Sequence, residues 1–309
     1  MVEHLSPERQ QLAADAQPEA RPLLSIVIPA YNEAEAITAT VEELLRVPEL
    51  NDAEIIVVDD GSTDDTAERL AHFDRIVLIR HRANRGYSAA IATGARLSKG
   101  DYILWYDGDG QHRPEDLLKV ARCLVENNLE YCIGVRALGS AEPRERRFGK
   151  LILRMAVSIA TSQPVGDFNS GLRGFRRDIL LRYLHLLPTG FGASTMTTLL
   201  MLERGHIGQE VPIITRSRIG KSSVRQFRDG MRTLMIILRI FLLFKPLLFF
   251  GAIGVFLILG GGIYGFAEAI TQRQGFPVFG ALIIILGVQS LFFGLLNDQI
   301  SHMRRERLD

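Results

Sequence analysis

Residues 101–116 read DYILWYDGDGQHRPED, and this stretch decides the fold of the chain. It starts with an apolar run that ends at Asp107, passes through a glycine-rich turn, and enters a segment of helical period at Pro114. An apolar run without alternation is typical of a strand buried on both faces. Further apolar runs lie at 23–30, 54–60 and 75–80, and helical segments lie at 33–46, 66–72, 87–97 and 114–127. Strand and helix in alternation predict a mostly parallel α/β sheet around one core.

Polar residues follow three of the predicted strands. The first strand runs into PAYNE at 29–33, the second into DDGS at 59–62, and the fourth into DGDGQH at 107–112. Ligands of such sheets bind beyond the carboxyl ends of the strands. Clustered carboxylates repel one another unless a cation or hydrogen-bond donors compensate them, so a divalent metal ion is the simplest explanation. Mg²⁺ and Mn²⁺ both suit one or two carboxylates combined with phosphate oxygens of a substrate.

Structural explanations stay open for part of this pattern. Ser62 and Thr63 could cap the helix that follows, and capping is the favoured interpretation for Asp64 and Asp65. The chain has two cysteines, Cys123 in a predicted helix and Cys132 in a predicted strand. Both are expected in the core, because the sequence has no CxxC motif and no histidine at ligand spacing.

Four motifs now point to a family. They are PAYNE, VDDGSTDDT, NRGYSAAIATGARLSKGDYILWYDGDGQHRPEDL and DFNSGLRGFRR. Together they resemble the family-2 glycosyltransferases of the GT-A fold, and among these the dolichyl/polyprenyl-phosphate sugar synthases, over about residues 23–245. The resemblance implies an enzyme that uses Mg²⁺ or Mn²⁺ and moves a hexose from a nucleotide-sugar, of the UDP-glucose or GDP-mannose type, to undecaprenyl or dolichyl phosphate. Because the motifs offer no covalent nucleophile, one displacement by the lipid phosphate would invert the anomeric centre.

The resemblance also implies roles for individual residues on the donor side. The nucleotide-sugar would be bound by Pro29, Tyr31, Glu33, Asp60, Arg85, Gly86 and Asp107. Metal and diphosphate would be bound by Asp107, Asp109 and Gln111. The turn at 84–86 could equally be structural. Asp167 matches the family's acid near the reacting sugar, although it could instead cap a helix.

The acceptor side calls for cations. A polyprenyl phosphate is already anionic near neutral pH, so its attack needs no strong general base, but it needs positive charge to align the phosphate and to offset the leaving diphosphate. Similar synthases place phosphate contacts at Arg136, Arg147, Arg173, Arg218, Lys221 and Ser222. Each could be a surface residue instead, and Arg144 and Arg146 compete with Arg147 for its alignment. The expected catalytic set is Asp109, Asp167, Arg136 and Arg218.

Two departures from the family pattern concern specificity. Similar enzymes often have Ser-Lys in the RxGxS segment, whereas here Ser222 is followed by Ser223 and Lys221 lies on the other side. Many relatives also carry an acid in the helix where this chain reads FGASTMTTLL. The phosphate contacts and the preference for sugar or acceptor are therefore expected to differ from those of similar enzymes.

The C-terminal part predicts a membrane anchor. Residues 246–266 and 276–296 are uncharged stretches of 21 residues each, long enough to cross a hydrocarbon core of about 30 Å. Buried helices of a soluble core are the weaker interpretation, because both stretches are apolar on all faces. Eight basic residues and one acid lie between 216 and 245, and Arg304, Arg305 and Arg307 follow the second stretch. This charge pattern predicts that both flanks, and so the N-terminal domain, lie on the cytosolic side of the membrane. The membrane would be a bacterial inner membrane or an ER-type membrane.

The predicted organisation therefore has five parts. Residues 1–22 form a flexible tail without an apolar segment, 23–222 the cytosolic GT-A domain, 223–244 an interfacial helix, 245–299 a transmembrane hairpin, and 300–309 a basic tail. Basic and apolar residues alternate near helical spacing in 223–244, which suits binding to membrane lipids, although a solvated helix is the alternative. The net charge of +1 gives no indication of nucleic-acid binding. Homo-oligomerisation stays open.

Two other functions compete with this prediction. A polysaccharide-forming family 2 enzyme would share the motifs, but it would normally bring a QxxRW-like segment and more membrane spans. A non-catalytic, lipid-bound scaffold would be expected to lose the aspartates and arginines of the site, and here Asp107, Asp109, Arg173 and Arg218 are present.

Overall fold

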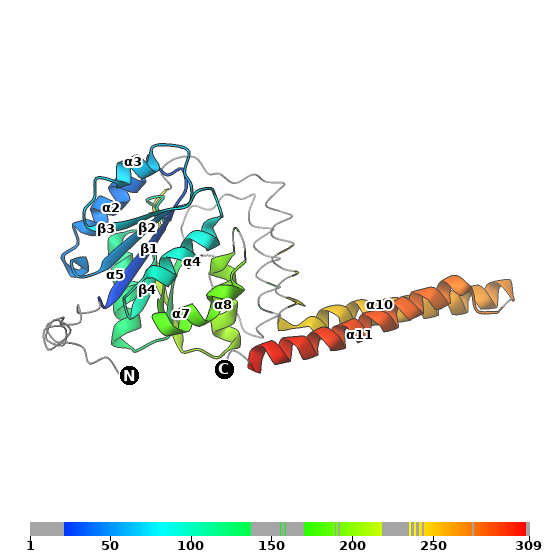
Figure 1. The fold of residues 1–309 in the computed structure, drawn as a ribbon. Helices are drawn as coiled ribbons and strands as arrows, with labels where there is room; N and C mark the ends of the chain where they lie inside the picture. Colours follow the sequence, from blue (N-terminus) through cyan, green and yellow to red (C-terminus); the bar gives the residue numbers. More distant parts are fainter. Residues whose placement is uncertain are drawn as a thin grey trace, which may run out of the picture. The chain divides into compact units, whose positions relative to one another are not determined.

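The protein is described by a computed structural model. It describes residues 22–136, 170–217 except 189 and 191, and 241–306 except 243 and 274, together with the single residues 155, 158, 235 and 238. The chain divides into two compact units, Met1–Ala141 with Asn169–Lys221 and Glu142–Phe168 with Ser222–Asp309 (Figure 1).

The first unit contains a seven-stranded sheet in the order β3-β2-β1-β4-β6-β5-β7. The strands are β1 (Leu24–Ala30), β2 (Glu54–Asp59), β3 (Ile76–Arg80), β4 (Tyr102–Trp105), β5 (Tyr131–Arg136), β6 (Arg173–Arg176) and β7 (Gly208–Ile213). Only β6 runs against its neighbours, β4 and β5, among the described pairs. The expected mostly parallel α/β sheet is confirmed, while β6 and β7 lie outside the strands that the apolar runs predicted.

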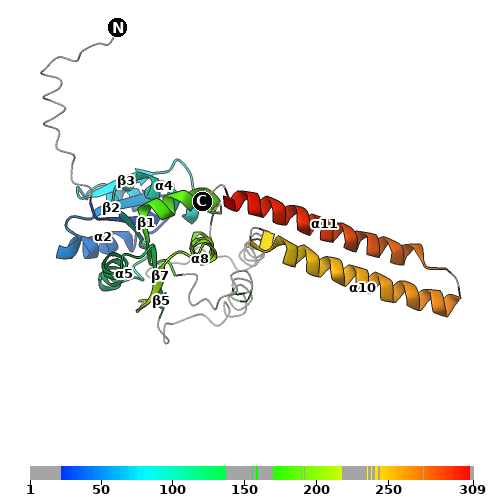
Figure 2. The same ribbon diagram turned by 90° about the horizontal axis from the view of Figure 1, so that it is seen from below.

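Helices cover both faces of this sheet. They are α2 (Ile37–Leu45), α3 (Thr66–Leu70), α4 (Tyr87–Leu97), α5 (Pro114–Glu126), α7 (Arg177–Tyr183) and α8 (Ala193–Glu203), with 3-10 turns η1 (Pro48–Leu50) and η3 (Leu184–Leu186). In β2, Ile55 and Val57 join the cluster that includes α2 and α5, whereas Ile56 and Val58 pack with Ala90 of α4. Figure 2 shows α2 and α5 on one side of the sheet and α4 on the other. A strand buried on both faces therefore reads as an unbroken apolar run.

The edge strand β3 departs from that rule. Each of its residues is half-buried or exposed, and Val77 is 47 % exposed. An edge strand has a neighbour on one side only, so its apolar run is less completely covered than that of a central strand.

The second unit is described mainly through a helical hairpin. Helices α10 (Pro246–Gln272) and α11 (Val278–Glu306) are both long and apolar enough to cross a membrane. Glycines let them pack closely, since a Cβ at Gly254 would lie 2.8 Å from the Gly287 carbonyl oxygen and one at Gly261 would lie 3.0 Å from that of Gly280. Their outward side chains are large and apolar, as a lipid environment requires, and α11 continues ten residues beyond the predicted span.

Candidate functional site

The carboxyl ends of β1 and β2 are tied together by short polar contacts. Asn32, in a left-handed conformation with φ 54°, donates its N–H to Ser62 Oγ at 3.0 Å and accepts the N–H of Thr63 at 2.9 Å. Asp64 accepts the N–H of Thr66, the first residue of α3, at 3.1 Å. The capping interpretation is thus supported for Asp64, whereas Asp65, the residue at the N-cap position, makes no side-chain cap hydrogen bond. The two loops form one rim.

Asp60 is buried beneath this rim. Its Oδ1 lies 2.6 Å from His81 Nδ1 and accepts the Arg85 N–H at 2.9 Å, while Oδ2 accepts the Gly86 N–H at 2.7 Å. Gly86 has φ 93°, and a side chain there would collide with the backbone of Gly190. The carboxylate therefore shapes the turn at 84–86, and the Arg85 side chain is left exposed.

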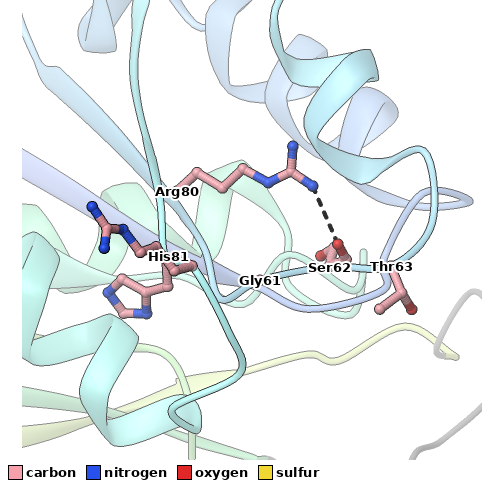
Figure 3. Close-up of a pocket in the computed structure, with 6 residues that line it drawn as sticks. Gly61, Ser62, Thr63, Arg80 and His81 are labelled. Atoms are coloured by element: carbon pink, nitrogen blue, oxygen red, sulfur yellow. Dashed lines mark hydrogen bonds between the residues drawn. The ribbon is translucent and has the colours of Figure 1, made fainter.

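Both carboxylate oxygens of Asp59 are also engaged by neighbouring residues of the fold. Its Oδ1 accepts the Ser62 N–H at 2.9 Å, and its Oδ2 lies 3.1 Å from Nε of Arg80. Beside this ion pair is an open hollow of about 350 Å³, lined by Gly61, Ser62, Thr63, Arg80, His81 and Arg82 (Figure 3). Arg80 spans it and donates to the Ser62 carbonyl at 3.3 Å. The hollow thus combines backbone polar groups with a basic wall, which suits an anionic or polar ligand.

Asp107 follows β4 and is held from several sides. The Tyr87 hydroxyl donates to its Oδ1 at 3.0 Å, and His112 Nε2 lies 3.4 Å from its Oδ2. A side chain at position 171 would collide with this carboxylate in its present position, so Gly171 leaves space for Asp107. The Asp107 side chain nevertheless keeps 27 % of its surface exposed. It can still bind a ligand.

The electrostatics around Asp107 favour its charged form. Burial acts to raise its pKa, but the hydrogen bond and charge of His112, the Tyr87 hydroxyl and the charge of Arg136 outweigh burial, so the pKa is lowered. Burial and the Asp107 charge raise the pKa of Tyr87 well above its ordinary value. Tyr87 therefore remains a hydrogen-bond donor to an ionised carboxylate at neutral pH.

Asp109 and Gln111 complete the turn after β4. Asp109 is 7 % exposed, and its Oδ1 accepts the Gln111 N–H at 3.1 Å. The Gln111 carbonyl accepts the N–H of Arg216, whose guanidinium contacts both carboxylate oxygens of Glu43 at 2.9 Å. Within the described residues, no group of three or more His, Cys, Asp or Glu side chains could hold a metal. Asp107 and Asp109 are hard oxygen donors at one turn, which fits an ion that completes its shell with substrate oxygens.

Arg173 lies in a different place from the one its expected role requires. Its side chain is completely buried in β6, and all three guanidinium nitrogens donate within the fold. The acceptors are the Ser170 carbonyl, the Ser194 carbonyl at 2.6 Å, and the Thr197 and Thr198 hydroxyls at 3.1 Å. The guanidinium also lies 5.7 Å from the Trp105 ring centre. We therefore treat Arg173 as a structural residue in place of the phosphate contact that the resemblance implies.

The other expected residues divide into two groups. Pro29 is buried within β1, Tyr31 and Glu33 are half-buried at the rim, and Arg136 is half-buried at the end of β5. Asp167, Arg147, Arg218, Lys221 and Ser222 lie outside the described residues, as does most of the predicted interfacial helix.

Sequence reasoning missed Tyr87 and His112 as parts of the site. Both lie inside quoted motifs, NRGY and DGDGQH, so their position beside the strand ends was the available signal. It missed as well the polar face of α8, where Ser194, Thr197 and Thr198 surround Arg173. A cluster of hydroxyl residues near the start of an otherwise apolar helix was the signal there.

Comparison with known proteins adds to this geometry. The model of the family "Glycosyl transferase family 2" matches residues 25–184, more than half of the chain. The chain belongs to glycosyl transferase family 2. A second model, "GtrB C-terminal hairpin", matches residues 245–303 and covers both apolar helices. This family 2 glycosyltransferase therefore has a membrane-type hairpin of a known kind after its catalytic domain.

Its relatives include a glycosyltransferase and two transferases whose names include undecaprenyl phosphate or dolichyl phosphate. Glycosyltransferase AglJ of Haloferax volcanii is 29% identical over 92% of this chain and 95% of its own length. Undecaprenyl-phosphate 4-deoxy-4-formamido-L-arabinose transferase of Pseudomonas aeruginosa is 30% identical over 91% of this chain and 86% of its own length. A UDP-N-acetylglucosamine–dolichyl-phosphate N-acetylglucosaminyltransferase of Methanococcus voltae is 30% identical over 51% and 71%. Full-length similarity thus extends through the hairpin.

Solved structures support the fold. Glucosyl-3-phosphoglycerate synthase from Mycobacterium tuberculosis, in complex with Mn²⁺, UDP and phosphoglyceric acid, has a TM-score of 0.58 at 19% identity. It covers 78% of this chain and 83% of its own. The same synthase is also known with Mg²⁺ and UDP. At this identity the likeness shows the GT-A type of fold alone.

Proposed function

We propose that this glycosyltransferase transfers a sugar from a nucleotide-sugar to a polyprenyl phosphate and inverts the anomeric centre. The observation that carries the proposal is the ionised, partly exposed Asp107 carboxylate at the carboxyl edge of a family 2 domain that continues into an apolar hairpin. The relatives whose names include dolichyl phosphate and undecaprenyl phosphate support the choice of acceptor.

A divalent ion fits the turn after β4. Asp107 and Asp109 would hold Mg²⁺ or Mn²⁺ with Gln111 beside them, because carboxylate oxygens are the ligands that hard cations prefer. When bound, the ion supplies positive charge that stabilises the leaving diphosphate. The protein contributes a carboxylate that is ionised and already oriented by Tyr87 and His112.

The transfer is a single displacement. An oxygen of the lipid phosphate forms a bond to the anomeric carbon while the bond from that carbon to the diphosphate breaks, and the nucleoside diphosphate leaves. Arg136, at the end of β5, is near enough for its charge to act on Asp107 and lower its pKa, and this supports its proposed role as a contact for phosphate oxygens. Asp167, Arg147, Arg218, Lys221 and Ser222 remain proposed contributors on the acceptor side.

The reaction would take place at the cytosolic face. The basic residues that flank both ends of the hairpin favour the cytosolic side, and the short connector would face the other compartment. A lipid acceptor anchored in the same bilayer would meet the catalytic domain on that side of the membrane.

A transfer assay in detergent tests the proposal. Radiolabelled UDP-glucose, GDP-mannose, UDP-galactose, UDP-GlcNAc and UDP-4-deoxy-4-formamido-arabinose are offered in turn with undecaprenyl phosphate and Mg²⁺ or Mn²⁺. Label in the organic phase from one donor supports the proposal and identifies the sugar. A hexose of the UDP-glucose or GDP-mannose type is expected. NMR of the product should show inversion, and retained configuration would contradict the single displacement.

The same assay separates the alternatives. Label in a water-soluble polymer would support a polysaccharide-forming enzyme, and nucleotide binding without transfer to any acceptor would support a scaffold. Asp52→Asn, an exposed loop change, is the control for protein handling.

A further inference from the structure

Asp107 is restrained on both carboxylate oxygens by neighbours from different parts of the chain. Tyr87, the first residue of α4, bonds Oδ1, and His112, in the loop before α5, faces Oδ2. Gly171, just before β6, leaves room for this arrangement and no more. A carboxylate held in this way cannot rotate freely about its terminal bond. Its lone pairs therefore point in fixed directions before any ligand arrives.

Tyr87 is itself held by residues that precede α8 or belong to β6 and α8. Its hydroxyl lies within hydrogen-bond reach of Ser194 and feels the positive charge of Arg173. Arg173 in turn donates to the Ser194 carbonyl at 2.6 Å. The next residue, Ser88, donates its N–H to the Gly190 carbonyl at 2.7 Å and ties the start of α4 to the loop before α8. Arg173 and Ser194 therefore help to position Tyr87, whose hydroxyl bonds Asp107.

His112 is held in place by burial and by contacts with Tyr106. Its side chain is 4 % exposed, its ring packs against Tyr106, and the Tyr106 hydroxyl donates to the His112 carbonyl at 2.8 Å. Among the described residues, its Nδ1 is buried without a hydrogen-bond partner. An N–H at Nε2 would point toward Asp107 Oδ2, which lies 3.4 Å away.

We propose that Tyr87 and His112 are positioning residues that orient the Asp107 carboxylate for the metal-bound diphosphate of the donor. This inference rests on the proposed function, because it gives Asp107 a metal and diphosphate as ligands. Groups that orient a metal-binding side chain typically change metal affinity or activity by about 10- to 100-fold when removed. Neither residue needs to touch the substrate.

Three variants and a matched control test this inference. Tyr87→Phe removes one hydroxyl, His112→Phe keeps a ring against Tyr106 but removes the N–H, and His112→Gln restores a donor. Tyr183→Phe is the control, because Tyr183 is also buried and its hydroxyl lies 2.9 Å from His206 Nε2. His206 precedes β7, so this contact is away from the carboxyl ends of the strands. Transfer is measured against Mn²⁺ and against polyprenyl phosphate.

Tyr87→Phe and His112→Phe should raise the half-saturating Mn²⁺ concentration about 10- to 100-fold, with the KM for the lipid unchanged. His112→Gln should recover part of this loss. Tyr183→Phe should keep the parental Mn²⁺ dependence. Parental Mn²⁺ dependence in Tyr87→Phe and His112→Phe, or an equal shift in the control, would overturn the proposal.

A binding arm separates this inference from the proposed function. Mn²⁺ binding is followed by electron paramagnetic resonance with UDP or with GDP present and without any lipid. Tight binding by the parent and weaker binding by the two phenylalanine variants supports the positioning role, even if the parent transfers no sugar to polyprenyl phosphate. Equal binding of Mn²⁺ by the parent and the variants overturns the proposal. Failure of the parent to bind Mn²⁺ in the presence of UDP or of GDP overturns it as well.

Discussion

Strands β2 and β4 flank β1 in the sheet, and each ends in a pair of aspartates with different fates. At the end of β2, Asp59 and Asp60 are buried, and their oxygens accept from Ser62, Arg85 and Gly86 or pair with Arg80 and His81. At the end of β4, Asp107 keeps 27 % of its side-chain surface exposed although two groups restrain it. The β2 pair builds the rim, whereas in the β4 pair Asp107 is partly exposed and only Asp109 is buried.

The difference teaches that an acidic strand end is not by itself a binding site. A carboxylate whose oxygens accept several backbone N–H groups stabilises a loop, and it has little capacity left for a cation. Asp60 was expected to bind the nucleotide directly. Its observed contacts favour an indirect role, in which it shapes the turn at 84–86 that would face the nucleotide.

The largest expected effect comes from the β4 pair. Asp107→Asn and Asp109→Asn should each lower metal-dependent turnover about 10³-fold, because the amide neutralises a ligand of the ion that stabilises the leaving diphosphate. The melting temperature should stay close to that of the parent. Transfer assays with and without EDTA measure the effect, with Asp52→Asn as the control. Full parental activity in EDTA would remove the metal from the proposal.

A second prediction extends the comparison to cations. Arg173→Met should destabilise the protein by about 3 kcal/mol, because the Ser170 and Ser194 carbonyls lose buried donors. Arg136→Gln, at a half-buried strand end, should leave stability unchanged and lower turnover. Thermal unfolding in detergent, paired with the transfer assay, separates the two. Parental stability of Arg173→Met with a raised KM for the lipid would restore its expected phosphate contact.

Asp60→Asn tests the structural side of the comparison directly. The amide would place an N–H against the donors of Arg85, Gly86 or His81, so the variant should lose about 2 kcal/mol of stability. Its melting temperature is compared with that of Asp107→Asn. If Asp107→Asn lowers the melting temperature as much as Asp60→Asn does, the proposed division of roles is wrong.

The smallest expected effect concerns Glu130, a carboxylate at the amino end of β5 and not at the carboxyl ends of the strands. Glu130 precedes β5, and its Oε2 accepts the Ile207 N–H at 2.8 Å and lies 2.9 Å from His206 Nδ1. Burial acts to raise the Glu130 pKa, but these hydrogen bonds outweigh it and hold the pKa below its ordinary value of 4.5. Its stabilising contribution is therefore present above pH 4.5 and is lost as the pH falls through the lowered value.

Glu130→Gln should consequently melt below the parent at pH 7, by the equivalent of about 1 kcal/mol. The difference should shrink as the pH falls below 4.5, and transfer activity at pH 7 should not change. Melting temperatures across this pH range measure the effect. A difference that grows toward acid would contradict the sign of the pKa shift.

Much of the fold could be predicted from the sequence, and for identifiable reasons. The apolar runs that form β1, β2 and β4 have apolar residues on both faces, because helices cover both sides of the sheet. Burial alone therefore explains their sequence pattern. β6 and β7 could not be found this way. β6 contains Arg173 and Arg176, and β7 has exposed positions at Gln209 and Glu210, so neither forms an apolar run.

The sequence alone also determined the order of the motifs, the acidic strand ends and the apolar hairpin, because each depends on residues that are adjacent in the chain. Only the tertiary structure decided which of those residues can meet a ligand. Asp60 and Asp107 are equivalent in the linear pattern, but hydrogen-bond donors from distant segments surround one and merely orient the other. The same holds for Arg173, whose burial depends on hydroxyl groups contributed by α8. Contacts between segments far apart in sequence set the availability of a side chain, and no local pattern records them.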